Sequence, residues 1–204
     1  MKDSKIVLKQ MYGMKQNVKG MRLAAEQWDN DFQTLISIIL SARTRDEVTI
    51  EVCKKLFGKF PTADKLSKAS LQEIETLIKP INFYRNKSKN ILNCAKVIVS
   101  EFNSKIPKSI EELVKLLGVG RKTANVFLTE MGGLGIGVDT HVSYISQKLG
   151  WTKNKDAHKI EQDLKKLFPQ KYWNNVNRTL VRFGKTHTSR KKKDELLNEI
   201  KKLK

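Results

Sequence analysis

Cysteine, proline and aromatic residues are scarce in this chain of 204 residues, and it contains no long apolar run. The chain has two cysteines, Cys53 and Cys94. Cys94 falls on an apolar helical face, so we expect a buried free thiol there and no disulfide. The three histidines are far apart in the sequence and indicate no metal site. No apolar run reaches the roughly 18 residues of a membrane span, and the first residues lack the apolar core of a signal peptide. We therefore expect a soluble, cytoplasmic monomer with no metal and no membrane partner.

Negative charge is the other shortage. The chain has 21 Asp+Glu against 40 Lys+Arg, which gives a formal net charge of +19. Such a surface repels itself unless a polyanion is the usual partner, and nucleic acid is the natural candidate. A solvated lysine-rich surface is the alternative. The hydrophobic content of 39% suffices for one good core or two small ones, which excludes wholesale disorder.

The four prolines all fall between segments whose apolar residues have helical spacing, where proline does least harm. No alternating strand pattern appears, so we predict an all-α fold. Asp31 is expected to cap one helix, and Ser70 and Ser109, each followed three residues later by glutamate, indicate capping boxes that open two more. Further helices are predicted at about 47–57, 88–102, 121–130, 140–149, 157–168 and 172–183, with a basic tail leading into a short helix.

The segment Leu116-Leu-Gly-Val-Gly-Arg-Lys-Thr-Ala124 places two glycines just before a helix start. Gly118 and Gly120 permit a tight turn between helices and a close approach of the backbone to another molecule. The helix that begins near Arg121 then offers unpaired N–H groups and the positive end of its dipole to an anion. Such a helix-hairpin-helix binds a phosphate without reading bases. A plain connection between two helices, which also needs a glycine, is the alternative.

Two residues near this hairpin are candidates for catalysis. Lys122 falls in the first turn of the following helix, where the dipole disfavours a cation and so favours the neutral, nucleophilic amine. Asp139 precedes the next helix and suits an N-cap whose second oxygen serves as an electrostatic partner and base. Taken alone, Lys122 is typical of an ordinary surface lysine and Asp139 of an ordinary N-cap. Together with the hairpin they indicate a site for amine attack on a sugar carbon of DNA.

Four segments of the chain resemble the endonuclease III family. Members of this family are bifunctional DNA glycosylases and abasic-site lyases of the helix-hairpin-helix–Gly-Pro-Asp superfamily. The resemblance runs from about residue 31 to 184, and the form Ser-Ala-Arg-Thr-Arg-Asp is closer to the archaeal branch than to the bacterial one. It implies two helical lobes with a DNA-binding cleft between them. Residues 24–132 would form a central lobe with the hairpin, and residues 1–23 and 133–204 a second lobe built from both termini. The four segments are Leu40–Asp46, Ile78–Tyr84, Leu116–Ala124 and Val138–His141.

The resemblance also implies roles for residues at matching positions. Lys122 matches the family's Schiff-base lysine, which attacks C1′ of the damaged nucleotide, expels the base and leaves an imine that permits β-elimination of the 3′ phosphate. Asp139 matches the catalytic aspartate, which stabilises the oxocarbenium-like state and assists proton transfer. Contacts with DNA are expected from Gly118, Val119, Gly120, Arg121, Thr123, Arg43, Phe83, Arg85, Lys87, Arg190 and Lys191.

Two of these residues are expected to act on the damaged base pair itself. Because the target base must leave the stack before Lys122 can reach C1′, the space it vacates has to be filled. Arg43 stands where the family places a polar residue that fills this space, and Phe83 aligns with the apolar wedge inserted opposite the lesion. Arg43 could instead contact a phosphate, and Phe83 could be a core residue beside Ile81.

The chain departs from the family near its C-terminal end. Endonuclease III proteins carry four cysteines there that bind a [4Fe–4S] cluster, whereas the matching segment Phe183–Arg190 has none. We therefore expect no cluster and no other cofactor. Arg190, Lys191, Lys192 and Lys193 are expected to keep the cluster loop's contact with the DNA backbone, unless they form only a solvated tail.

The expected function is base-excision repair. The substrate would be double-stranded DNA with an oxidised pyrimidine or an abasic site, encountered in the nucleoid of a prokaryote. A mismatch-specific thymine or uracil glycosylase on the same fold is one alternative. A non-catalytic helix-hairpin-helix DNA-binding protein is another, which borohydride trapping of a covalent adduct would distinguish.

Overall fold

A computed structural model describes residues 3–18 and 20–203, and all regular secondary structure in these ranges is helical. The all-α prediction is therefore confirmed for the described part of the chain. The chain separates into two compact units: unit 1 comprises Met1–Met21 and Gly133–Lys204, and unit 2 comprises Arg22–Gly132. Whether these units are the two lobes expected from the sequence, each with its own role in DNA binding, stays a prediction. None of the described helices is long and apolar enough to cross a membrane.

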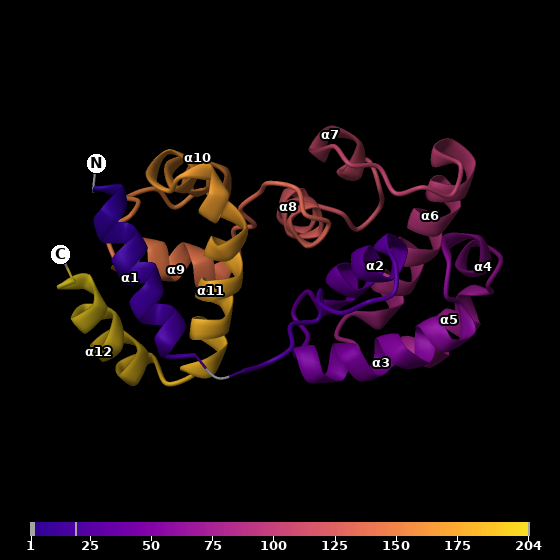
Figure 1. Cartoon of the computed structure of the whole chain (residues 1–204). Helices are drawn as coiled ribbons and strands as arrows, with labels where there is room; N and C mark the ends of the chain where they lie inside the picture. Colours follow the sequence, from indigo (N-terminus) through magenta and orange to yellow (C-terminus); the bar gives the residue numbers. More distant parts are fainter. Residues whose placement is uncertain (1–2, 19, 204) are drawn as a thin grey trace. The chain divides into compact units, whose positions relative to one another are not determined.

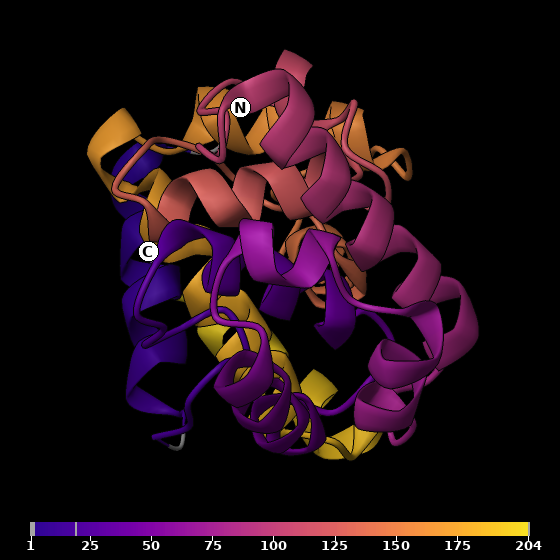
Figure 2. The same ribbon diagram turned by 90° about the vertical axis from the view of Figure 1, so that its right-hand side faces the viewer.

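Unit 2 is built around α2 (Asp31–Ser41), in which every residue from Phe32 to Leu40 is buried. A helix that is apolar on nearly all sides belongs at the centre of a core. α3 (Asp46–Lys59), α6 (Tyr84–Phe102) and α8 (Arg121–Glu130) pack against it. α4 (Ala63–Ser67) and α5 (Leu71–Ile78) lie against α6, and α7 (Ile110–Leu113) lies against α8 (Figures 1 and 2).

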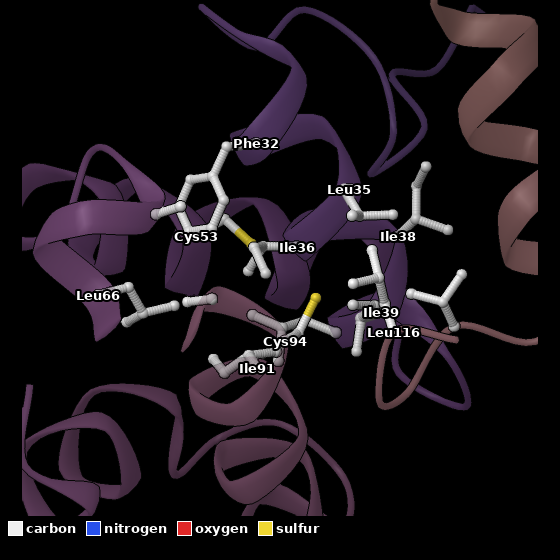
Figure 3. Packing of buried hydrophobic residues seen from close by; sticks show 14 of the residues in the cluster. Phe32, Leu35, Ile36, Ile38, Ile39, Cys53, Leu66, Ile91, Cys94 and Leu116 are labelled. Atoms are coloured by element: carbon white, nitrogen blue, oxygen red, sulfur yellow. The ribbon is translucent and has the colours of Figure 1, made fainter. Parts of the chain in front are cut away.

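Both cysteines are part of the core of unit 2. Cys53 on α3 and Cys94 on α6 are fully buried and free, and their sulfur atoms lie among the aliphatic side chains of α2 (Figure 3). Burial raises the pKa of both thiols to about 12, so they stay protonated at neutral pH. The prediction of a buried free thiol at Cys94 is confirmed.

Unit 1 joins the two ends of the chain. α1 (Ser4–Gln16) packs against α11 (Trp173–Thr186) and α12 (Arg190–Lys201), and α9 (Thr140–Lys148) packs against the same two helices (Figure 1). α10 (Ala157–Leu167) and the 3₁₀ helix η1 (Gln170–Tyr172) complete the unit. The indole of Trp151 donates to Oε1 of the fully buried Gln10 at 2.8 Å, and Nε2 of Gln10 donates to the carbonyl of Lys201 at 3.1 Å. This chain of hydrogen bonds ties α1 to the end of α12.

Side-chain caps fix several helix starts. Oγ of Ser70 accepts from the N–H of Glu73 and the Glu73 carboxylate accepts from the N–H of Ser70, so the predicted capping box of α5 is present. Ser109 caps α7, because its Oγ accepts from the N–H of Glu112. For α2 the expectation is wrong by one residue. The cap is Asn30, whose Oδ1 accepts from Gln33 at 3.0 Å, because Asn caps a helix as well as Asp does.

Candidate DNA-binding and catalytic site

The glycine hairpin connects α7 to α8 in unit 2. Gly118 adopts φ +87°, a conformation that strongly favours glycine, and the next N–H, of Val119, donates to the carbonyl of Leu116 at 3.0 Å. Gly120 is the N-cap of α8 and has no side chain with which to satisfy the first N–H groups of the helix. The start of α8 therefore offers backbone donors and a positive dipole end to an anion such as a DNA phosphate.

The two glycines are needed for different reasons. A Cβ on Gly118 would lie 3.0 Å from Cβ of Asn90 and 3.3 Å from Cγ2 of Ile39, so the turn packs directly on α6 and α2. A Cβ on Gly120 would meet no atom within 4 Å. Gly118 thus serves the fold, whereas Gly120 keeps the outer face of the hairpin open to another molecule. Val119 is 5% exposed and belongs to the core, so only its backbone remains for the DNA contact expected of it.

Lys122 lies in the first turn of α8, directly after this hairpin, and is half-buried together with Arg121 and Thr123. Its side chain thus leaves the helix at the N-terminal end, where the N-cap residue offers no side-chain bond to the first N–H groups. The amine and the N–H groups that are candidates for binding a phosphate therefore come from the same turn of one helix. This is the arrangement that the sequence predicts for a nucleophile next to a bound phosphate.

Asp139 is the N-cap of α9 in unit 1, and its Oδ1 accepts from the N–H of Val142 at 2.9 Å. The cap predicted from the sequence is therefore present. The buried side chain of Asn177 donates to the carbonyl of Gly137 at 2.5 Å and so fixes the extended segment that enters the cap. Asp139 also lines a surface hollow of about 470 Å³, beside Val138, Thr140, Ser143, Tyr144, Gln147 and Ala157. Because one oxygen of the carboxylate is fixed by the cap, the other can stabilise a positive charge in the hollow without reorientation of the side chain.

Arg43 and Phe83 lie close together on unit 2. The guanidinium carbon of Arg43 is 5.7 Å from the centre of the Phe83 ring. Both residues have positive φ, +57° for Arg43 and +61° for Phe83, although neither is glycine. Phe83 is 59% exposed, so the alternative that it belongs to the core is excluded. A strained, exposed aromatic residue next to a cation suits a probe that enters a DNA duplex.

Lys87 requires a correction. The sequence leads us to expect a contact between its ammonium group and DNA, but the residue is only 7% exposed. Its Nζ donates to the carbonyls of Leu40 at 2.7 Å and Ala42 at 2.5 Å, and lies 3.4 Å from Oγ1 of Thr44. Burial lowers the pKa of the amine to about 8. An ammonium group that three protein oxygens surround is not available to a phosphate. Arg85, two residues earlier, is exposed.

Arg190 and Lys191 open α12 in unit 1. Both are exposed, and the guanidinium carbon of Arg190 is 5.1 Å from the centre of the Tyr144 ring. Tyr144 in turn donates to Asp194 of α12, and Nζ of Lys148 lies 3.2 Å from the same carboxylate. These contacts dock α12 on α9, the helix that Asp139 caps. The sequence indicated only a basic tail and a short helix here, and the twelve-residue α12 is longer than expected.

The residues present do not fit the iron–sulfur cluster of the family. Such a cluster needs four thiolates, whereas the chain has two cysteines, both in the core of unit 2 with raised pKa values. Among the residues that the structure describes, no three His, Cys, Asp or Glu side chains gather as metal ligands. The segment Phe183–Arg190 covers the end of α11 and the loop that leads into α12, and α12 packs on α1 and α9.

Two residues near the candidate site have roles that the sequence analysis does not assign. Nδ2 of Asn82 donates to the carbonyl of Arg43 at 2.5 Å, and its N–H donates to Oγ1 of Thr44 at 3.2 Å. Asn177 supports the segment before Asp139. Asn82 lies within one of the motifs, directly before the residue expected to be a wedge, and this position is the signal that could have found it. Asn177 sits within an ordinary helical pattern that gives no such signal.

Comparisons with known proteins bear on the identity of the chain. A family model described as "HhH-GPD superfamily base excision DNA repair protein" matches residues 36–170. Endonuclease III of Thermotoga maritima is 43% identical over 155 residues, which cover 76% of this chain and 73% of that protein. Endonuclease III of Synechocystis is 45% identical over 161 residues, which cover 76% and 74% of the two proteins.

Solved structures give the same answer for the fold. A trapped endonuclease III–DNA covalent intermediate is similar with a TM-score of 0.83 and 31% identity, covering 93% of this chain and 89% of that one. A thermostable thymine-DNA glycosylase has a TM-score of 0.81 at 18% identity over 93% and 89% of the two chains, which shows the shared fold alone. The chain belongs to the HhH-GPD superfamily of base excision DNA repair proteins and, within it, to the endonuclease III family.

Proposed function

We propose that the protein is a bifunctional DNA glycosylase and abasic-site lyase that removes oxidised pyrimidines from duplex DNA. The observation that carries this proposal is the place of Lys122, in the first turn of the helix that follows the glycine hairpin, in a chain of the endonuclease III family. The hairpin binds a phosphate beside the lesion through the N–H groups at the start of α8. The Lys122 amine then lies within reach of the damaged nucleotide, because α8 is already bound to the DNA backbone.

In the proposed reaction the neutral Nζ of Lys122 attacks C1′ of the damaged nucleotide. The bond from C1′ to the base breaks, and the base leaves with the electron pair and takes up a proton. Loss of a proton from the nitrogen and opening of the sugar give an imine. Removal of a proton from C2′ then expels the 3′ phosphate by β-elimination. Water finally hydrolyses the imine and restores Lys122.

Asp139 faces the positive charge that develops on the sugar. Its carboxylate is fixed by the bond from the N–H of Val142, so the charge meets an oriented partner and little reorganisation is needed. We propose that Lys122 is the nucleophile and that Asp139 is its electrostatic partner in the reaction. Proton transfers to and from the sugar would then use Asp139.

The enzyme is proposed to work as a monomer without the family's cluster. Its contact with the DNA backbone at this end of the chain would come from the first turn of α12, with Arg190 and Lys191 exposed there. Because α12 docks through side-chain contacts with α9 and α1, a rigid basic surface forms with no iron. Salt should weaken these contacts as it weakens any phosphate contact.

Borohydride trapping tests the proposal directly. The protein is incubated with a duplex that contains one abasic site, and the reductant fixes any imine as a covalent adduct. Wild type and Lys96→Ala, which removes an exposed lysine of α6, should form the adduct, whereas Lys122→Ala should not. An adduct that survives in Lys122→Ala would assign the nucleophile to another amine. DNA binding without any adduct in wild type would favour a monofunctional glycosylase or a binding protein.

A panel of duplexes, each with one damaged or mismatched base, identifies the base that is removed. Excision of oxidised pyrimidines is the expected result. Excision of thymine or uracil from mismatches, with no activity on oxidised bases, would replace the proposed substrate and leave the Schiff-base chemistry in place.

A further inference from the structure

The two exposed probe residues of unit 2 come from separate loops. Arg43 follows the end of α2, and Phe83 precedes the start of α6. Each has a left-handed backbone, which is strained for a non-glycine residue and persists only if the surroundings enforce it. Phe83 is exposed, so packing of its own side chain does not enforce this conformation. Other contacts must therefore hold the two loops.

Lys87 contacts both loops at once. Its backbone N–H donates to the carbonyl of Phe83 at 3.0 Å, which fixes the turn that begins α6. Its side chain passes to the other loop, where Nζ donates to the carbonyls of Leu40 and Ala42. Leu40 lies in the last turn of α2, where carbonyls lack helical partners and the dipole favours a cation. One residue thus fastens the end of one helix to the start of another.

Asn82 adds a second connection between the same loops. Its side chain donates to the carbonyl of Arg43, and its N–H donates to Oγ1 of Thr44. The carbonyls of Ala42 and Arg43, on either side of the Arg43 Cα atom, therefore accept from the side chains of Lys87 and Asn82. Unlike Lys87, Asn82 is exposed, so it can be changed without opening the core.

We propose that Lys87 is a positioning residue that holds Arg43 and Phe83 side by side as one preformed wedge for opening the damaged base pair. The inference deepens the proposed function and rests on it for the identity of the substrate. Lys87 does not touch DNA and acts through the two loops. Its removal should therefore impair extrusion of a paired nucleotide. Imine formation at a sugar that needs no extrusion should stay unchanged.

The variant Lys87→Met keeps an unbranched side chain of similar length and removes the ammonium group. The matched control is Lys89→Met, which removes the same charge from an exposed lysine of the same helix. Asn82→Ala is the second test variant, because it loosens the same loops from an exposed position. Thermal unfolding of each variant shows whether the fold survives.

Two measurements separate positioning from a general structural role. The first is the fluorescence of 2-aminopurine placed opposite an oxidised pyrimidine, which rises when the base pair opens. The second is the single-turnover rate of borohydride-trapped adduct on a single-stranded oligonucleotide with one abasic site, where no pair has to open. Both are run with the protein in saturating excess, so that a change in affinity does not alter the rate.

Lys87→Met should slow the fluorescence rise on the duplex by roughly 10- to 100-fold, the size of effect that a small misplacement of a positioned group produces. Asn82→Ala should slow it by roughly two- to tenfold, as expected for one lost hydrogen bond. Adduct formation on the single strand should change by less than about twofold in both variants, and Lys89→Met should match wild type in both assays.

Three results would overturn the proposal. One is a normal fluorescence rise in Lys87→Met. Another is an equal loss on duplex and single strand in a variant that remains folded. The third is a normal rise in Asn82→Ala combined with an unfolded Lys87→Met. If wild type opens the pair but forms no adduct anywhere, the proposed lyase function fails, whereas the positioning role of Lys87 is still read from the fluorescence.

Discussion

Gly184 shows how a single residue can fix the helix that is capped by Asp139, the carboxylate proposed to be catalytic. It lies within α11 at a close approach to His141, in the first turn of α9. A Cβ on Gly184 would lie 2.3 Å from Nδ1, 2.7 Å from Cγ and 3.0 Å from Cβ of His141. Since the imidazole is obstructed down to its own Cβ, a rotamer change alone does not make room, and α9 must shift. Asp139 caps that helix and would shift with it.

Gly184→Ala should therefore lower both stability and activity. We expect a loss of roughly 1–3 kcal/mol in the free energy of unfolding, the usual range for overpacking, and a loss of lyase activity on the order of tenfold or more. Urea denaturation and borohydride trapping measure the two effects.

The control for this variant is Gly58→Ala. Gly58 also lies within a helix, α3, but a Cβ there would meet nothing within 4 Å. Alanine should stabilise that helix by roughly 0.5–1 kcal/mol, because it lowers the entropy of the unfolded chain and suits the helix. A stabilised Gly184→Ala variant with full activity would show that the contact between α9 and α11 is not tight.

At the level of elements, the two glycines of the hairpin should affect stability and DNA binding separately. Gly118→Ala places a side chain at φ +87° against Asn90 and Ile39, so we expect a loss of roughly 1–3 kcal/mol in stability. Gly120→Ala has open space around it, so stability should change by less than about 1 kcal/mol. Its methyl group would nevertheless stand where a phosphate approaches the start of α8.

Fluorescence anisotropy with a labelled duplex tests this separation. Gly120→Ala should weaken DNA binding by roughly tenfold, equivalent to about one charge-assisted hydrogen bond. An unaltered Kd for this variant would mean that DNA does not approach the N-terminus of α8.

The contact between α12 and α9 is another property of elements, and it depends on pH. Asp194 accepts from Tyr144 and pairs with Lys148, and these groups hold the pKa of its carboxyl below the usual value of 3.8. A carboxylate with a lowered folded pKa stabilises the protein above the unfolded pKa, and this contribution is lost as the pH falls through the folded pKa. The contribution of Asp194 should therefore be constant at neutral pH and begin to fall once the pH drops below about 4, where the unfolded carboxyl takes up a proton.

Asp194→Asn tests this, since it removes the charge and keeps an oxygen for Tyr144. At pH 7 it should lower the free energy of unfolding by about 1 kcal/mol, because the pair is partly exposed and screened. The difference from wild type should shrink as the pH falls below about 4. Glu195→Gln, one residue further along the same helix and exposed, should stay within about 0.5 kcal/mol of wild type at pH 7. A difference that stayed constant down to pH 3 would exclude the charge as its origin.

How far the sequence predicts these elements depends on how local the determining interactions are. The capping box at Ser70, the cap at Asp139 and the start of α8 at Arg121 are readable because a few neighbouring residues decide them. α4 has only five residues, which are too few for a periodic pattern, so the sequence does not predict this helix. The burial of Lys87 could not be predicted, because it depends on carbonyls of Leu40 and Ala42, more than forty residues away in the chain. The same holds for the backbone strain at Arg43 and Phe83.

For the whole molecule the main quantity is the net charge of +19. Acidic side chains are about half as numerous as basic ones, 21 against 40, so they cannot neutralise this charge. Binding to DNA relieves the self-repulsion and releases condensed counterions, so affinity should fall steeply with salt. The slope of that dependence counts phosphate contacts, whichever unit provides them.

The first turn of α12 offers a way to test where those contacts lie. Arg190 is engaged with Tyr144, and Lys193 is half-buried, with a pKa that burial lowers. Lys191 and Lys192 remain exposed. We therefore expect the double variant Lys191→Ala/Lys192→Ala to weaken DNA binding and to flatten the plot of log K against log salt by up to about 1.8, from roughly 0.9 for each lost phosphate contact.

Lys201→Ala/Lys202→Ala is the matched control, because it removes two exposed lysines from the other end of the same helix and changes the net charge equally. If DNA lies along the first turn of α12, only the first double variant changes the slope. Equal, small changes in affinity with unchanged slopes in both would mean that α12 contributes general positive charge and no phosphate contact. The basic surface at this end of the chain would then be a solvated tail, and the DNA contacts of the enzyme would have to come from the hairpin and the wedge residues.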